Sequence, residues 1–304
     1  MNQKAKSAPA LAILGPTGAG KSALAEALAE RLDCRILNAD AFQIYRGFDI
    51  GTAKPRQRNR YELLDILEPT ETFSVGEFLR RAVPLLHRDW TAGRPTIVCG
   101  GTGLYVRALF ENYQGLAPPA PPDLRARLTQ EVREWGIVAF SARYGLNLES
   151  LPLPDRANPV RVVRAVERLL IEEDEAAIPE LPWHARRFKF ALEMDREALK
   201  RRLAQRLDAM LAEGWVDEVK ALLRAYPPDA PAFRSIGYAQ IIEVVEGRKS
   251  LEQAREEILT KTWQYARRQL TWLKKEPNLV WIAGNETIDQ QVQAVYGYIR
   301  RAEG

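Results

Sequence analysis

Residues 11–28 read LAILGPTGAGKSALAEAL and form the first recognisable element of the chain. A short apolar run over residues 10–14 predicts a buried strand, and Gly15, Gly20, Lys21 and Ser22 then match the pattern G-x-x-x-x-G-K-S/T. Helical spacing follows at Leu24, Leu28 and Leu32. A strand, a glycine-rich loop and a helix in this order predict a loop whose backbone amides surround a phosphate group.

The predicted loop combines backbone, charge and metal-binding groups. Its glycines let the chain curl until successive N–H groups face phosphate oxygens, and the helix N-terminus adds partial positive charge. Lys21 would neutralise the terminal phosphates, and the Ser22 hydroxyl would ligate Mg²⁺. The sequence therefore predicts a di- or triphosphate site with Mg²⁺ as cofactor, formed by Gly15, Pro16, Thr17, Gly18, Ala19, Gly20, Lys21 and Ser22.

Composition limits the class of protein. A chain of 304 residues can bury a large core and form two units, and its two cysteines fit a reducing cytosol. The two histidines exclude a histidine-rich metal centre, and the net charge of +4 mildly favours an acidic partner. No apolar run is long enough to cross a bilayer, and residues 1–9 lack the apolar segment of a secretory signal. We expect a cytoplasmic monomer without membrane contact.

Strands and helices alternate along the first third of the chain. Residues 35–38 predict a second strand that leads to Asp40, and residues 96–99 predict a third that runs into Gly100. Ser74 and Glu77 predict a capping box for a helix in which Pro84 would cause a kink or break. This alternation predicts an α/β fold, a P-loop kinase-like parallel sheet core whose strand-end loops converge on one crevice.

Composition changes at the proline-rich segment over residues 118–122, which predicts a stiff linker. We therefore expect a first core part over 1–119, a helical insertion domain over 120–186 and a second core part over 187–304 with basic C-terminal helices. The insertion contains helical patterns over 123–135 and 158–171. The second core part contains predicted strands over 187–194 and 279–282 and predicted helices over 195–214 and 250–275.

Asp40 is the carboxylate available beside the predicted phosphate loop. Nucleotide-hydrolysing proteins usually place an aspartate after an apolar strand to hold Mg²⁺ and position water, whereas the strand TIVC here runs into Gly100. Asp40 can accept a proton from an incoming nucleophile, which suits group transfer better than hydrolysis. A local cap or an outer Mg²⁺ contact are the other roles open to this carboxylate. The residues alone leave donor and acceptor unnamed.

Six segments occur in an order similar to that of the tRNA dimethylallyltransferases: GPTGAGKS, NADAFQIYRGFDIGTAKP, CGGTGLY, NPVRVVRAVER, FRSIGYAQ and ARRQLTWLKK. The resemblance covers about residues 11–275, and the second and last segments are its most specific ones. It implies transfer of a dimethylallyl group from dimethylallyl diphosphate to N6 of adenosine 37, beside the tRNA anticodon. The phosphate held by the loop would then be a diphosphate leaving group, and the adenine must leave its stack to react.

The resemblance also implies roles for individual residues. Asp40 would accept or steer the N6 proton, and Lys21 with Mg²⁺ on Ser22 would neutralise the departing diphosphate. Thr17 resembles a position that contacts substrate, and Thr102 matches a position that lines the reaction channel. The expected catalytic residues are therefore Asp40, Lys21 and Thr102.

Basic residues indicate an RNA surface. Arg161, Arg164 and Arg168 share one helical face, and Lys261, Arg268 and Lys275 form a stripe on the last long helix. For the interleaved Trp263 and Trp272, core packing is the favoured interpretation. Residues 40–43 and 234–240 match family segments that approach the anticodon loop. The full set of expected tRNA contacts is Asp40, Ala41, Phe42, Gln43, Arg161, Arg164, Arg234, Gln240, Arg267 and Arg268.

The chain departs from the family pattern at Ala41, where serine is usual, and at Tyr61 and Glu62, where histidines are common. Three other functions stay open. One is an isopentenyltransferase that acts on free adenine nucleotides, another is a P-loop kinase of small metabolites, and the last is a non-catalytic RNA-binding P-loop protein. The insertion and the basic C-terminal helix argue against a small acceptor, because such a substrate requires neither.

Overall fold

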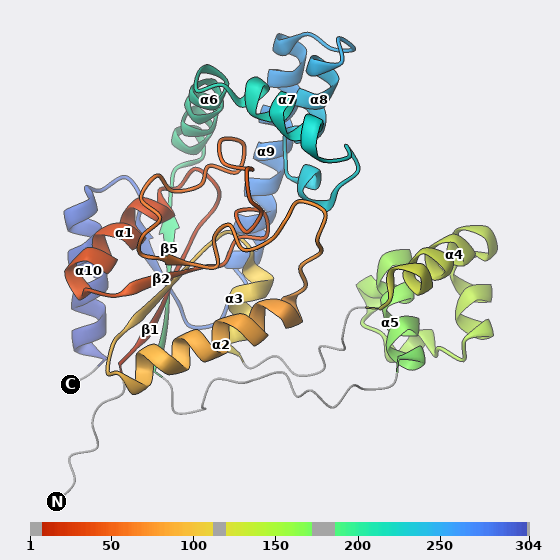
Figure 1. Ribbon diagram of the computed structural model, residues 1–304. Helices are drawn as coiled ribbons and strands as arrows, with labels where there is room; N and C mark the ends of the chain where they lie inside the picture. Colours follow the sequence, from red (N-terminus) through yellow and green to blue (C-terminus); the bar gives the residue numbers. More distant parts are fainter. Residues whose placement is uncertain (1–7, 112–119, 172–185, 303–304) are drawn as a thin grey trace, which may run out of the picture. The chain divides into compact units, whose positions relative to one another are not determined.

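The structure is a computed structural model that describes residues 8–111, 120–171 and 186–302. The chain divides into two compact units (Figure 1). Unit 1 comprises residues 1–113 and 179–304, and unit 2 comprises residues 114–178. Residues 118 and 119 of the predicted proline-rich linker lie outside the described residues, whereas Pro121 is the N-cap and Pro122 the first residue of helix α4 (Pro122–Arg143).

Unit 1 is built on one six-stranded parallel sheet with the order β3-β2-β4-β1-β5-β6. Its strands are β1 (Ala10–Leu14), β2 (Arg35–Asn38), β3 (Tyr61–Glu62), β4 (Thr96–Cys99), β5 (Arg187–Glu193) and β6 (Leu279–Ala283). The central strands β1 and β4 are buried along their whole length, as expected for strands covered on both faces. The predicted α/β fold with a parallel core is confirmed.

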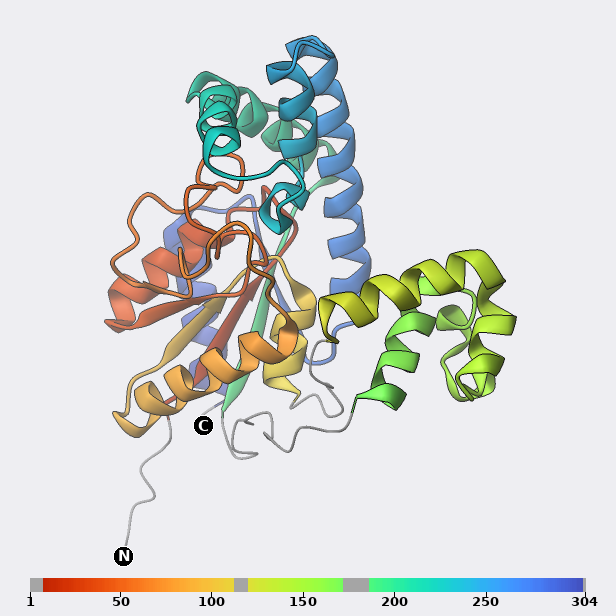
Figure 2. The same ribbon diagram turned by 45° about the vertical axis from the view of Figure 1, so that its right-hand side comes forward.

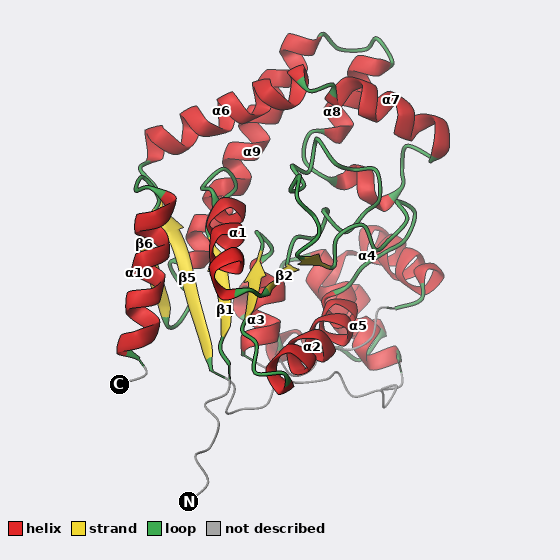
Figure 3. Cartoon of the chain, turned by 60° about the vertical axis from the view of Figure 1, so that its left-hand side comes forward, coloured by secondary structure: helices red, strands yellow, loops and turns green. Residues whose placement is uncertain are grey.

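Helices cover both faces of this sheet (Figures 1 and 3). Helices α1 (Lys21–Leu32) and α10 (Ile288–Arg301) pack together on one face, where Leu24, Leu28 and Val295 join strand residues in one apolar core. Helices α2 (Val75–Thr91) and α3 (Gly103–Phe110) cover the other face. Because helices cover both faces of the sheet, a ligand site is expected at the loops where the strands end.

Helix α2 begins at a side-chain cap and contains a proline. Ser74 caps it by accepting a hydrogen bond from the Glu77 amide at 3.1 Å, but the Glu77 carboxylate pairs with Arg81. Pro84 lies within the helix, which continues to Thr91 and is not broken there. Burial of Phe78, Leu79, Ala82, Val83 and Leu86 along one face holds the helix together despite the amide that proline lacks.

A second helical layer lies above the carboxyl edge of the sheet (Figure 2). It contains α6 (Arg196–Ala212), α7 (Trp215–Ala225), α8 (Tyr238–Val245), α9 (Leu251–Leu273) and the 3-10 helix Pro231–Arg234. These elements share an apolar core with the loop that follows β2, in which Phe48, Trp215 and Tyr238 are almost fully buried. A Cβ at Gly51 or Gly237 would come within 2.2 Å of the Trp215 indole, so two sequence segments need glycine there.

We expect Gly51→Ala to lower the free energy of unfolding by about 1–3 kcal/mol, the usual cost of overpacking a core. The added methyl group would overlap Trp215, which has no room to move. The matched control is Gly297→Ala in α10, whose Cβ would meet only the flexible end of Arg301 at 3.3 Å. Urea unfolding of both variants checks this, and equal stability of the two would contradict the packing argument.

Unit 2 is a small helical body with its own core. Helix α4 (Pro122–Arg143) packs against α5 (Pro159–Leu170), and two 3-10 helices span Leu148–Ser150 and Leu153–Asp155. Gly136, with non-helical φ and ψ of +75° and +161°, divides α4 into two helical parts, so the first part ends at Trp135 as predicted. The apolar core is formed by Leu128, Val132, Phe140, Val162, Val163 and Val166.

Candidate active site

A cavity of about 360 Å³ lies at the carboxyl edge of the sheet in unit 1. Its floor comes from the loops after β1, β2 and β4, and helices α6 and α9 supply its walls. Thr17, Asp40 and Gly100 are each lining residues. The predicted convergence of the three strand-end loops on one crevice is therefore confirmed.

The loop between β1 and α1 has the geometry that its glycines predict. Gly18 and Gly20 have φ values of +81° and +98°, which disfavour any other residue. A Cβ at Gly18 would also come within 2.8 Å of Leu203 on α6. Thr17, Lys21 and Ser22 line the cavity, whereas Gly15, Pro16, Gly18, Ala19 and Gly20 shape the loop without lining it.

Two cations lie at this loop. Lys21 Nζ donates to the Pro16 carbonyl at 2.9 Å, and burial lowers the pKa of Lys21 to about 8. Arg206 of α6 donates to Thr17 Oγ1 at 3.3 Å, and burial lowers its pKa while Asp40 opposes that shift. Sequence reasoning missed Arg206, because it lies 189 residues from Thr17 and belongs to no recognised spacing. The pair gives the cavity a positive end suited to a diphosphate.

The lowered pKa of Lys21 predicts a pH dependence of diphosphate binding. Below pH 8 the lysine is charged before the ligand arrives, and above it the neutral amine must take up a proton on binding. The affinity should therefore fall by up to about tenfold per pH unit above 8. Calorimetric titration with inorganic pyrophosphate between pH 7 and 9.5 measures this. Lys21→Met is the control, and the same fall in that variant would assign the dependence to another group.

The two carboxylate oxygens of Asp40 have different surroundings. Oδ1 accepts hydrogen bonds from the amides of Phe42 at 2.9 Å and Gln43 at 3.3 Å, which fixes the side chain. Oδ2 accepts none from the described residues, and it lies 3.7 Å from the place of a Cβ on Gly101. One oxygen thus caps the loop while the other is available to a ligand in the cavity.

Thr102 contacts the loop that carries Asp40. Its hydroxyl accepts a hydrogen bond from the Ala41 amide at 3.1 Å, and Thr102 is not among the residues that line the cavity. Gly100 and Gly101 take that place. A Cβ on Gly100 would lie 2.2 Å from the Ala39 carbonyl, so only glycine allows β2 and β4 to end this close together. In this structure Thr102 therefore holds the Asp40 loop in place from outside the cavity.

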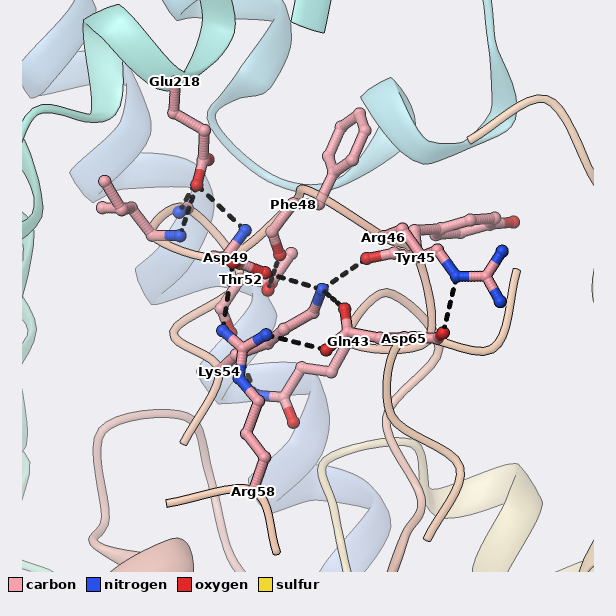
Figure 4. A network of polar contacts seen from close by, with 12 residues as sticks. Gln43, Tyr45, Arg46, Phe48, Asp49, Thr52, Lys54, Arg58, Asp65 and Glu218 are labelled. Atoms are coloured by element: carbon pink, nitrogen blue, oxygen red, sulfur yellow. Dashed lines mark hydrogen bonds and ion pairs between the residues drawn. The ribbon is translucent and has the colours of Figure 1, made fainter. Parts of the chain in front are cut away.

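An ionic cluster around one buried lysine fixes the loop that follows Asp40 (Figure 4). The Lys54 side chain is fully buried, and its Nζ donates to the Tyr45 carbonyl, to Asp49 at 2.9 Å and to Asp65 at 2.5 Å. Arg58 bridges the other oxygens of the same two aspartates at 3.0 and 2.7 Å. Burial alone would raise the pKa of Asp49, but hydrogen bonds from Lys54 and Arg58 outweigh it and lower that pKa. Two positive and two negative groups balance each other here.

Further contacts join this loop to α7 and to the cavity (Figure 4). Glu218 accepts hydrogen bonds from the three successive amides of residues 49–51, the closest at 2.6 Å. Gln43, which lines the cavity, donates from Nε2 to the carbonyls of Thr52 and Ala53 at 3.0 and 3.1 Å. The segment DIGTAKP is therefore a scaffold that positions the cavity wall beside Asp40.

The comparisons with known proteins agree on one family. The model of the IPP transferase family matches residues 43–276, which is well over half of the chain. The chain belongs to the IPP transferase family. It is 36% identical to a tRNA dimethylallyltransferase of Symbiobacterium thermophilum, covering 96% of this chain and 95% of that protein. A tRNA dimethylallyltransferase of Kocuria rhizophila is 39% identical over 90% of this chain and 89% of its own.

Solved structures of the family have the same fold. The full-length tRNA isopentenylpyrophosphate transferase of Bacillus halodurans superposes with a TM-score of 0.71 at 30% identity, over 96% of this chain and 95% of its own. A eukaryotic dimethylallyltransferase acting on tRNA gives a TM-score of 0.72 at 20% identity, over 96% of this chain and 78% of its own. At that identity the second match concerns the fold alone.

The residues expected to contact RNA in this member of the family lie in several parts of the structure. Phe42, Gln43, Arg234 and Arg268 line the cavity. Arg267 is exposed on α9, beside Trp272 and Lys275. Ala41 is half-buried and presents its amide to the hydroxyl of Thr102.

Gln240, the remaining expected RNA contact of unit 1, is buried, with only 5% of it exposed. In unit 2, Arg161 is exposed, whereas Arg164 pairs with the buried Glu167 at 2.8 Å, as Arg125 also does. Arg164 therefore also stabilises unit 2 itself. Trp263 and Trp272 are half-buried, which agrees with the favoured packing interpretation.

The site offers Mg²⁺ the Ser22 hydroxyl as a protein ligand of suitable chemistry. The described ranges contain no cluster of three His, Cys, Asp or Glu residues that could hold a metal alone. The Ser22 hydroxyl lines the cavity next to Lys21, and Mg²⁺ commonly combines one protein oxygen with phosphate oxygens and water. The donor set therefore fits Mg²⁺ carried in with a diphosphate.

Proposed function

We propose that this member of the IPP transferase family transfers the dimethylallyl group of dimethylallyl diphosphate to N6 of adenosine 37 in tRNA and releases diphosphate. The observation that supports it most is one cavity that combines two cations at one wall with a carboxylate oxygen to which no described residue donates. This arrangement combines a site for an anionic leaving group with a proton acceptor.

The proposed reaction breaks one bond and forms another. The C1–O bond of the donor breaks, its electron pair leaves with diphosphate, and the N6 lone pair forms a bond to C1. The N6 proton passes to Asp40 Oδ2. Lys21, Arg206 and the loop amides stabilise the charge that develops on the diphosphate. Mg²⁺ bound through Ser22 would add to that neutralisation.

The acceptor side of the cavity has the chemistry of RNA contacts. Arg234 and Arg268 supply positive charge, and Tyr265 supplies a ring that Arg268 overlies at 5.7 Å. An adenine extruded from the anticodon loop would meet these side chains on its way to Asp40. The proposal extends to unit 2 as a further tRNA-binding part, within the insertion expected over 120–186, and to a monomer that acts in the cytoplasm. None of the described helices is long and apolar enough to cross a membrane.

The acceptor is tested by reversing charge on α9. We expect Arg267→Glu/Arg268→Glu to weaken binding of an anticodon stem-loop and to lower its salt slope by about one for each phosphate that the variant no longer neutralises. Prenylation of the stem-loop and of AMP is measured side by side for parent and double variant. Affinity for inorganic pyrophosphate should stay close to that of the parent, because neither residue belongs to the phosphate loop.

A matched control for this test is Arg300→Glu/Arg301→Glu, which makes the same charge change at two exposed residues of α10. The two results that contradict the tRNA assignment are preference of the parent for AMP and stem-loop transfer that ignores the charge reversal. Stem-loop binding without any transfer by the parent would instead favour a non-catalytic RNA-binding protein.

A further inference from the structure

Gln269 is a buried polar residue on α9 that joins two loops of the site. Its side-chain Oε1 accepts a hydrogen bond from the Thr17 amide at 2.8 Å, across 252 residues of sequence. Its Nε2 donates to the Gly101 carbonyl at 2.9 Å, across 168 residues. Only 7% of Gln269 is exposed, so both bonds are largely shielded from water. One amide group thus connects α9 to the phosphate loop and to the loop after β4.

The second loop is shaped to receive α9. A Cβ on Gly101 would lie 2.6 Å from Gln269 Nε2, and a Cβ on Gly103 would lie 2.6 Å from the Trp272 ring. Both glycines therefore allow an approach that any side chain would prevent. Arg107 of α3 lies over the same Trp272 ring at 5.5 Å. The C-terminal half of α9 is docked on this loop through two successive contacts.

The residues next to Gln269 belong to the acceptor side. Arg268 lines the cavity, and Arg267 is exposed on the outer surface of α9. Displacement of α9 from the loops would therefore move the residues proposed to meet RNA. Displacement of the phosphate loop would move the Thr17 amide, which donates a hydrogen bond to Gln269. The Gln269 side chain is therefore bonded to the donor site and also helps to position the acceptor site.

We propose that Gln269 is a positioning residue that couples donor binding to acceptor binding. A diphosphate in the phosphate loop favours the docked position of α9. RNA bound to α9 in turn favours the ordered conformation of the phosphate loop. This inference rests on the proposed function. Both ligands stabilise one arrangement, so each should raise the affinity for the other by the same factor. Couplings of this kind are typically about 5- to 150-fold.

The test measures the coupling factor directly. Inorganic pyrophosphate with Mg²⁺ is titrated into the full chain with and without a saturating anticodon stem-loop, and the ratio of the two Kd values is the factor. Pyrophosphate replaces the prenyl donor so that no reaction occurs. We expect a factor of about 5 or more in the parent. In Gln269→Leu it should fall close to 1, because leucine can neither accept from Thr17 nor donate to Gly101.

Two further variants separate coupling from damage to the fold. Gln205→Leu makes the same change on an exposed residue of α6 and should keep the parental factor. Gln269→Glu retains an acceptor for the Thr17 amide but cannot donate to the Gly101 carbonyl. Its coupling factor should also fall, which gives a reading if Gln269→Leu does not fold. A purely structural role for Gln269 would lower the melting temperature and leave the coupling factor unchanged.

The outcomes distinguish this inference from the proposed function. A parental coupling factor in a folded Gln269 variant overturns the inference, as does a parent that prenylates the stem-loop but binds the two ligands independently. A parent that neither binds nor prenylates the stem-loop overturns the proposed function and the inference together. Loss of the factor in both Gln269 variants, with Gln205→Leu unchanged, supports it.

Discussion

Asp40→Asn should lower the rate of prenyl transfer by about 10²–10⁴-fold, the scale for losing a general base. Asparagine preserves the shape, and its Oδ1 can still accept the hydrogen bonds of the Phe42 and Gln43 amides. An amide nitrogen would replace Oδ2, however, and it cannot take the N6 proton. Single-turnover prenylation of an anticodon stem-loop at saturating donor measures the chemical step.

The control for Asp40→Asn is binding of Mg²⁺ and diphosphate. The Kd for diphosphate in the presence of Mg²⁺ should change little, because Asp40 is proposed to contact the acceptor and not the leaving group. Asp217→Asn makes the same change at an exposed residue of α7 and should have parental rates. If diphosphate binding that depends on Mg²⁺ collapses together with turnover, Asp40 belongs to the metal site instead.

Lys21→Ala should lower turnover by about 10²-fold or more, the scale for removing one strong contact to the transition state. Lys21 is a desolvated cation at the end of the cavity that receives the diphosphate, so its charge acts with little screening. The effect should be larger on the rate of transfer than on donor binding, because charge on the leaving group grows as the C1–O bond breaks. Rates at saturating donor separate the two.

Stem-loop affinity is the control for Lys21→Ala and should be close to that of the parent, since the proposed RNA contacts lie on other elements. Lys220→Ala removes an exposed lysine of α7 and should leave turnover unchanged. Near-parental turnover of Lys21→Ala would exclude the phosphate loop from the reaction.

The phosphate loop, the main strands and the parallel character of the core can all be predicted from the amino-acid sequence. The pattern from Gly15 to Ser22 is local, because glycine conformations and the start of a helix depend on neighbouring residues. The strand over 96–99 was predicted with its observed bounds, since a short apolar run between turn residues has few other solutions. The convergence of the loops at Asp40 and Gly100 followed from the topology of parallel sheets.

The distant groups that complete the site can be identified only in the folded chain. Arg206 and Gln269 reach Thr17 from 189 and 252 residues away, and no pattern of spacing could place them there. Burial likewise decided that Gln240 faces the core, because helix α8 packs on that side. Lys54 stabilises the loop after Asp40 because its buried amine pairs with two aspartates, Asp49 and Asp65. Local patterns specify conformation, whereas burial and long-range contacts depend on how the whole chain packs.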